Sequence, residues 1–217
     1  MQVTEVFRSV QGEGRLMGVP TTFVRTTGCH LRCTWCDAAY AFYGGTKRTV
    51  EELLADVRER GARDVCFTGG EPLLQKDAWE FIHALLADGR RVLVETSGNI
   101  PFRQANALPD AKRALLCISM DVKCPGSGMA ERNDLSLLAD LRPADQLKFV
   151  IADEADYRFA VRVVRERGPF PCPVYFNPVG GVDAKAITEW LLAEASPPEV
   201  HVGIQLHKLL WGDVPGR

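Results

Sequence analysis

Three cysteines near the N-terminal end of the chain stand close enough together to bind one metal group. They are Cys29, Cys33 and Cys36, with the spacing C-x-x-x-C-x-x-C, in a loop after a β-rich run at residues 21–28. Thiolates spaced in this way converge on iron–sulfur clusters, and three of them leave one iron open. A structural zinc site takes four protein ligands. No second cysteine pair completes one, and His30 is poorly placed to join because it adjoins Cys29. The triplet therefore predicts a reactive iron–sulfur site.

Two further features, a glycine-rich segment and a single arginine, lie within or at the end of apolar runs. The segment from Thr68 to Pro72 reads Thr-Gly-Gly-Glu-Pro, and its glycines would let backbone N–H groups approach a ligand closely. Arg25 lies inside an apolar strand, where a guanidinium is costly to bury without an anionic partner. Its planar fork suits the carboxylate of a ligand. A structural ion pair with a neighbouring acid is the alternative.

Short β-rich runs alternate with longer helical patterns along the chain, without an internal repeat or a linker. This order indicates βαβ units, a parallel sheet and an α/β fold in one domain covering residues 1–217. The expected strands are 21–28, 64–70, 91–98, 115–123, 146–152, 172–178 and 199–207, and the expected helices are 49–61, 75–89, 134–141, 153–168 and 182–196.

Several of these strands are apolar on one face and polar on the other near the C-terminal end. Asp121 and Lys123 share such a polar face, as do Gln146 and Lys148. A parallel strand covered by helices on both faces reads apolar throughout, whereas the interior mouth of a barrel can hold a polar ligand. The pattern favours a curved, partial barrel. Edge strands with solvated faces are the alternative.

The composition excludes several other classes. The chain has 217 residues, of which 46% are hydrophobic and 25% charged, and a net charge of −2, so neither a basic nucleic-acid groove nor a basic membrane face is expected. No segment has the length of a signal peptide or a membrane span, which predicts a cytoplasmic protein. Seven cysteines make a disulfide framework improbable. Cys66, Cys117 and Cys172 lie in apolar or proline-flanked surroundings and are expected to pack as small hydrophobes.

The cysteine triplet, with Trp35 just before its third member, resembles the signature of the radical S-adenosylmethionine superfamily. The resemblance implies that the amino and carboxylate groups of S-adenosylmethionine bind the fourth iron of a 4Fe-4S cluster. The reduced cluster then splits this cofactor to give a 5′-deoxyadenosyl radical. The glycine pair at residues 69–70 resembles the superfamily element that meets the aminocarboxylate of the cofactor.

A wider set of motifs resembles one family within this superfamily, the 7-carboxy-7-deazaguanine synthases. The set comprises FRSVQGEG at 7–14, FVRTTGC at 23–29, TGGEP at 68–72, ETSG at 95–98, QLKFVI at 146–151 and QLHK at 205–208. The resemblance implies a partial (β/α)6 barrel in a homodimer. It also implies conversion of 6-carboxy-5,6,7,8-tetrahydropterin into 7-carboxy-7-deazaguanine with loss of ammonia, as in queuosine and archaeosine biosynthesis. Alternatives are another small radical enzyme, such as a glycyl-radical activase, and a non-catalytic iron–sulfur or zinc module.

The same resemblance implies roles for individual residues. Those expected at the pterin substrate are Val10, Gln11, Gly12, Glu13, Arg25, Thr68 and His207. Those expected at S-adenosylmethionine are Trp35, Cys36, Asp37, Gly70, Asp121, Val122, Lys123, Asn177, Pro178, Val179 and Gly180. Glu95 and Ser97 are second-line candidates for the same mouth. A flavodoxin- or ferredoxin-type protein would supply the electron.

One position departs from the family pattern. After the third cysteine and its aspartate, the family usually carries Thr or Ser, whose hydroxyl contributes to a magnesium ion near the substrate carboxylate. Here that position is Ala38, which offers no side-chain oxygen. Because Mg²⁺ keeps several waters and needs few protein ligands, it can still bind through substrate and water, but a protein-ligated ion is not expected.

Overall fold

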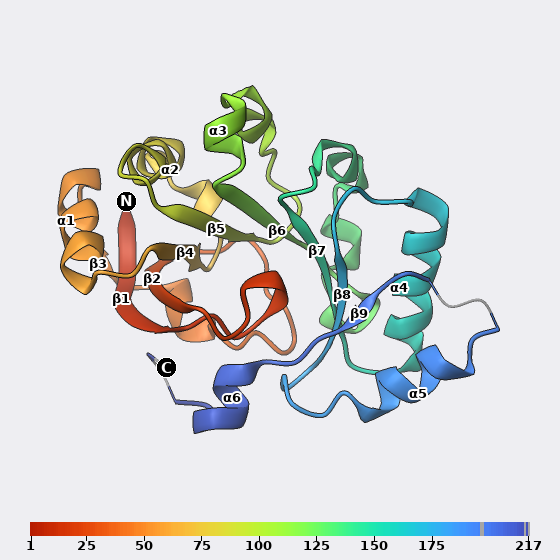
Figure 1. Ribbon diagram of the computed structural model, residues 1–217. Coiled ribbons are helices and arrows are strands. Elements are labelled where there is room, and N and C mark those ends of the chain that lie inside the picture. The colour runs from red at the N-terminus through yellow and green to blue at the C-terminus, as the bar shows by residue number, and fades with distance from the viewer. Residues whose placement is uncertain (196–197, 215, 217) are drawn as a thin grey trace.

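The computed structural model describes residues 1–195, 198–214 and 216, and in this part of the chain one sheet of nine strands forms the centre (Figure 1). The strand order is β3-β1-β2-β4-β5-β6-β7-β8-β9, parallel from β2 to β9, with β1 and β3 antiparallel at one edge. The strands are β1 (Gln2–Val10), β2 (Pro20–Thr26), β3 (Thr46–Lys47), β4 (Asp64–Gly69), β5 (Arg91–Thr96), β6 (Leu116–Val122), β7 (Gln146–Ile151), β8 (Val174–Pro178) and β9 (His201–Val202).

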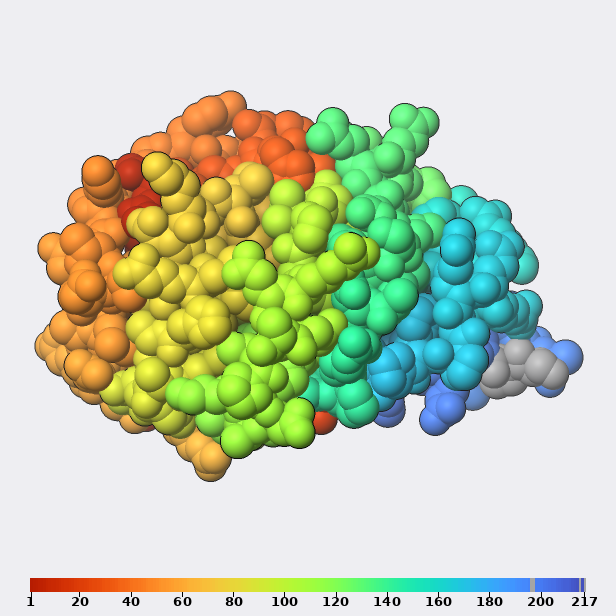
Figure 2. All heavy atoms as spheres, turned by 90° about the horizontal axis from the view of Figure 1, so that it is seen from above, coloured from red at the N-terminus to blue at the C-terminus, as the bar shows by residue number. Residues whose placement is uncertain are grey.

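Helices follow most of the parallel strands and cover the outer face of the curved sheet (Figure 1). They are α1 (Val50–Arg60), α2 (Ala78–Ala87), α3 (Asp110–Arg113), α4 (Glu154–Arg167) and α5 (Lys185–Ala193). The last helix, α6 (Leu206–Trp211), instead lies against the turn after β1. Successive segments lie next to one another across the surface in chain order, from orange to blue (Figure 2). Strands β2 and β4 to β8 with these connections confirm the expected partial (β/α)6 barrel. No helix among the described residues is long and apolar enough to cross a membrane.

The expected helix boundaries are set by local chemistry. Thr49 caps α1 in a capping box, in which its hydroxyl accepts from the Glu52 N–H and the Glu52 carboxylate accepts from the Thr49 N–H. Asp153 caps α4 by accepting from the backbone N–H of Asp156. Gly61 ends α1 at φ 70°, a conformation that favours glycine. The expected helix at 182–196 is shorter, because α5 ends at Ala193, and its last residue, Ser196, lies outside the described residues.

One strand was not predicted, and two expectations about elements are wrong. Residues 2–10, for which no element was expected, form β1 and pair antiparallel with β2. The strand expected at 199–207 is reduced to β9, because the chain leaves the sheet at Gly203 and then forms α6. The helix expected at 134–141 is a 3-10 helix, Leu135–Asp140. In the first two cases, contacts between distant segments decide the outcome.

The two faces of the sheet are packed differently, as the period-two pattern predicts. Val24, Met120, Phe149 and Phe176 point to the outer face and are completely buried in the main core under the helices. The interior has an apolar floor made by Leu16, Phe23, Cys66, Leu93 and Cys117. Strand register sets its side chains level with one another, since Phe23 pairs with Cys66, Cys66 with Leu93 and Leu93 with Cys117. Polar side chains begin directly above this floor.

Candidate active site

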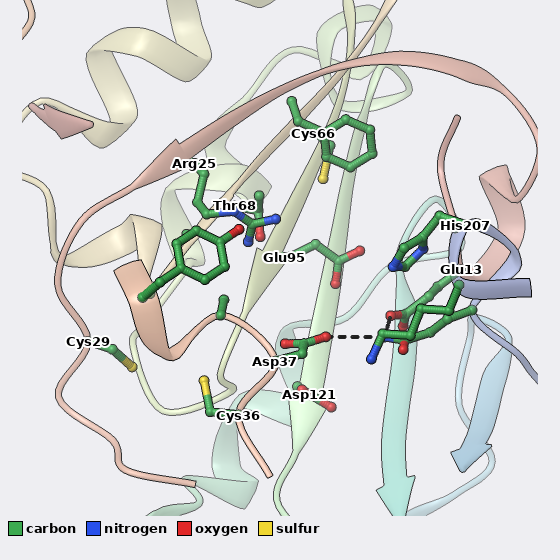
Figure 3. Close-up of a pocket in the computed structure, with 18 of the residues that line it drawn as sticks. Glu13, Arg25, Cys29, Cys36, Asp37, Cys66, Thr68, Glu95, Asp121 and His207 are labelled. Atoms are coloured by element: carbon green, nitrogen blue, oxygen red, sulfur yellow. Dashed lines mark hydrogen bonds between the residues drawn. The ribbon is translucent and has the colours of Figure 1, made fainter. Parts of the chain in front are cut away.

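Two adjoining cavities, of about 290 and 130 Å³, open at the C-terminal ends of the parallel strands. Ligand sites of barrel folds lie at this end of the strands. The close-up shows side chains from the strands, the cysteine loop and α6 directed into the larger cavity (Figure 3). Both cavities are lined by Glu13, Cys33, Cys36, Asp37, Asp121, Lys123, Lys148, Gln205 and Lys208.

The three cysteines of the triplet lie at these cavities as half-buried free thiols. The sulfur atoms of Cys29 and Cys36 point toward the same space (Figure 3). Burial raises the pKa of all three thiols, so metal, which binds thiolates, must displace their protons. Three thiols at one cavity suit an iron–sulfur cluster with one open iron.

The glycine pair after β4 is needed for close packing against the cysteine loop. A Cβ on Gly70 would stand 2.2 Å from the carbonyl oxygen of Gly28, so no side chain fits there. The Gly70 N–H donates to Thr26, and the Glu71 N–H donates to Gly28. The expectation that N–H groups of this turn face a ligand is therefore wrong. No described group donates to the carbonyl oxygen of Gly70, which suits the amino group of a ligand.

Glu71 anchors this turn from below and is completely buried. Its Oε1 accepts from the backbone N–H of Leu73 at 3.0 Å and from the Thr96 hydroxyl at 2.9 Å. Its Oε2 accepts from the N–H and the hydroxyl of Ser97 at 2.7 and 2.5 Å. This carboxylate ties the glycine turn to the end of β5, and Ser97 serves that contact as well as lining the larger cavity.

Arg25 forms the structural ion pair that its sequence context offered as the alternative, and it also lines the larger cavity. Its Nε donates to Glu5 at 2.7 Å, and the Tyr40 hydroxyl donates to the same carboxylate oxygen. Burial would lower the pKa of Arg25, but Tyr40 and Glu5 raise it above its ordinary value. The head of the side chain points toward Thr68 in the cavity (Figure 3), and no described group accepts from its two terminal nitrogens. The ion pair thus orients a guanidinium whose outer edge remains for a carboxylate.

Glu13 connects the two ends of the open sheet. Its Oε2 accepts from Lys148 at 2.9 Å and from Asn177 at 3.1 Å, and its Oε1 accepts from Gln205 at 2.6 Å. The Gln205 amide also donates to Asp37 at 3.3 Å. A carboxylate has about four acceptor positions. A ligand at Glu13 must therefore use the remaining position or replace one of these donors.

His207 lies on α6 and not at a strand end as expected. The N–H of Leu206 donates to the carbonyl oxygen of Gly12 at 2.8 Å, which brings α6 against the N-terminal turn. A Cβ on Gly12 would stand 2.0 Å from the His207 ring, so this contact requires a glycine. Burial is the main cause that lowers the pKa of His207. Its ring lines the larger cavity.

The two groups of expected site residues overlap in the structure, because Glu13, Cys36, Asp37, Asp121 and Lys123 line both cavities. All seven residues expected at the pterin line the larger cavity. The smaller cavity is lined by Trp35, Cys36, Asp37, Asp121, Val122, Lys123 and residues 177–180, whereas Gly70 lines the larger one. Asn177 and Asp121 line the smaller cavity, and the buried Oδ1 of each has no hydrogen-bond partner among the described residues.

Several cavity residues lay outside the sequence prediction. Lys148 lines the larger cavity, but the sequence indicated only that it belongs to a polar strand face. That polar face was the one feature of the sequence that could have identified it as a site residue. Glu5 and Tyr40 hold Arg25, and nothing in their sequence context indicates this. Cys66 was expected to be purely structural, but its thiol also lines the cavity and accepts from Gln11 at 3.7 Å.

Comparison with known proteins defines the class of this site. The model of the radical SAM superfamily matches residues 23–125, which contain the triplet and the glycine pair. QueE from Escherichia coli shares the fold with a TM-score of 0.72 at 22% identity, covering 94% of this chain and 93% of that one. The protein is a radical SAM enzyme, and this family implies a 4Fe-4S cluster and S-adenosylmethionine.

Full-length relatives then identify the family. A 7-carboxy-7-deazaguanine synthase from Thermoplasma acidophilum is 41% identical over 216 residues and all of both chains. Another from Koribacter versatilis is 39% identical over 97% of each chain. The chain belongs to the 7-carboxy-7-deazaguanine synthase family, and a glycyl-radical activase is thereby excluded.

Proposed function

We propose that this protein converts 6-carboxy-5,6,7,8-tetrahydropterin into 7-carboxy-7-deazaguanine with loss of ammonia. The names of its full-length relatives support this reaction. The observation that carries it is the larger cavity, which Arg25 and Glu13 line from opposite sides (Figure 3). A pterin with one carboxylate and one guanine-like edge of N–H groups matches these two ends.

The residues of the chain would bind and orient the two ligands. Arg25 would bind the substrate carboxylate, and Glu13 would accept from the pterin N–H groups. Asn177 and Asp121 would accept from the cofactor in the smaller cavity. When bound, the cluster and S-adenosylmethionine supply the radical hydrogen abstraction, and the protein supplies position and shielding. We further propose a homodimer of single-domain chains, each reduced by a flavodoxin- or ferredoxin-type protein.

The direct test is turnover under anaerobic conditions. The reconstituted protein, S-adenosylmethionine, dithionite and 6-carboxy-tetrahydropterin are expected to give 7-carboxy-7-deazaguanine, detected by mass. Formation of 5′-deoxyadenosine without the deazaguanine product would show a radical enzyme with another substrate. Absence of both products from a protein with full iron content would contradict the proposed function.

Turnover is expected to be the same with magnesium and with a magnesium chelator. Ala38 is buried at the larger cavity and has no side-chain oxygen for an ion. The hydroxyl that the family resemblance expects at this position is therefore missing. The matched variant Ala38→Thr restores a hydroxyl and should make turnover respond to magnesium. Loss of wild-type turnover in chelator would contradict this expectation.

Arg25→Ala is expected to raise the KM for the pterin about 10- to 100-fold, since hydrogen bonds between charged groups contribute about 1.5–3 kcal/mol. Iron content should remain unchanged, because Arg25 does not contact the cysteines through any hydrogen bond or ion pair of the described residues. Arg158→Ala on the exposed face of α4 serves as the control. A collapse of iron content in Arg25→Ala alone would show that Arg25 acts on the fold.

A further inference from the structure

Lys148 lies where the two cavities meet, and it is not among the residues expected to contact substrate or cofactor. Its side chain is only 10% exposed. The Nζ lies 2.9 Å from Oε2 of Glu13 and 3.4 Å from Oε2 of Glu95. Strand register also sets Lys148 beside Asp121. The ammonium group of Lys148, on β7, therefore contacts two carboxylates, that of Glu13 in the N-terminal turn and that of Glu95 on β5.

We propose that Lys148 is a positioning residue of this active site, whose ammonium holds the carboxylates of Glu13 and Glu95 at the boundary between the two cavities. This proposal rests on the proposed function, because the pterin N–H groups are what the two carboxylates would meet. Both carboxylates line the larger cavity, and Glu13 lines the smaller one as well. Lys148 thereby sets where the substrate lies relative to the cofactor.

The fold by itself does not require this buried charge. One level below, the same interior face is filled by uncharged Leu93 and Cys117. Removing an ammonium and two carboxylates from water costs several kcal/mol per ion, and apolar side chains in their place are often as stable. The charges are explained if a polar ligand completes their hydrogen bonds. The larger cavity beside them provides the room for that ligand.

The charge state of this cluster follows from its surroundings. Burial would lower the pKa of Lys148, but Glu13 and Glu95 raise it well above its ordinary value. Burial raises the pKa of Glu95, and Lys148 opposes that shift. Without the ammonium, Glu95 would hold its proton to a higher pH. The charged and titratable groups that face the cluster are Glu13, Arg25, Asp37, Glu95, Asp121, Lys123, His207 and Lys208.

The test compares Lys148→Met with wild type and with Lys148→Arg. The methionine variant keeps the length of the side chain and removes the charge. Its KM for the pterin should rise about 10- to 100-fold, and the acidic limb of its kcat/KM profile should move to higher pH. Lys148→Arg should recover part of both effects. Iron content should equal that of wild type, because no hydrogen bond or ion pair of the described residues joins Lys148 to a cysteine.

Lys185→Met, on exposed α5, is the matched control and should change none of these quantities. If Lys148→Met does not fold, Lys148→Gln carries the same test, because its amide donates without a charge. An unchanged KM and pH profile in a folded variant would overturn the proposal, as would a loss of iron in every variant. Failure of wild type to make the deazaguanine would instead overturn the proposed function.

Discussion

Replacing Cys33 by alanine is expected to abolish formation of 7-carboxy-7-deazaguanine and to reduce bound iron from about four atoms per chain to well below one. Cys33 lines both cavities, and membership of the radical SAM family implies that its thiol binds one iron of the cluster. Two remaining thiols cannot hold three irons. Iron analysis after anaerobic reconstitution and the electron-spin spectrum of the reduced protein measure the effect, and product analysis measures its consequence.

The control for this prediction is Cys172→Ala. Cys172 is also a buried cysteine, but it belongs to the main core and lines neither cavity. Its replacement should cost about 1 kcal/mol of unfolding free energy and leave iron content and turnover as in wild type. Normal iron content in Cys33→Ala would contradict the assignment of the triplet.

The second large effect is expected for Glu71→Ala, which should lower the free energy of unfolding by about 3–5 kcal/mol. The substitution removes the acceptor of four donors from Leu73, Thr96 and Ser97, all of them buried with Glu71. Of these donors, the Ser97 hydroxyl keeps a second acceptor in Asn99, and the other three are left without a partner. Each buried donor left without a partner costs about 1–3 kcal/mol. In a chain of this size the melting temperature should fall by about 10 °C.

Thermal unfolding of Glu71→Ala and of Glu51→Ala measures this difference. Glu51 is exposed in the first turn of α1, so its replacement should change stability by no more than about 0.5 kcal/mol. Glu71→Gln should lie between wild type and Glu71→Ala, because its amide keeps one acceptor oxygen. Equal melting temperatures for Glu71→Ala and Glu51→Ala would show that the three donors left without Glu71 find other partners.

The sequence by itself determined the features that local patterns encode. The spacing of Cys29, Cys33 and Cys36 requires only a few intervening residues, and the caps of α1 and α4 depend on contacts within one turn. Alternation of period two and helical spacing predicted most of the sheet and its two faces, since these periods follow from backbone geometry. The resemblance added the family, which full-length relatives confirm.

Only the tertiary structure decided how the two ends of the chain complete the site. Glu13 meets Lys148 and Gln205 across 135 and 192 residues of sequence, and Leu206 bonds to Gly12. These contacts arise because the curved sheet brings β1 near the segment after β9. The periodicity of hydrophobic residues describes single helices and strands, so it does not predict contacts between the two ends of the chain. The same curvature places α6 where a strand was expected. The sequence showed Lys148 only as one residue of a polar strand face, whereas the tertiary structure places it at the boundary of the two cavities.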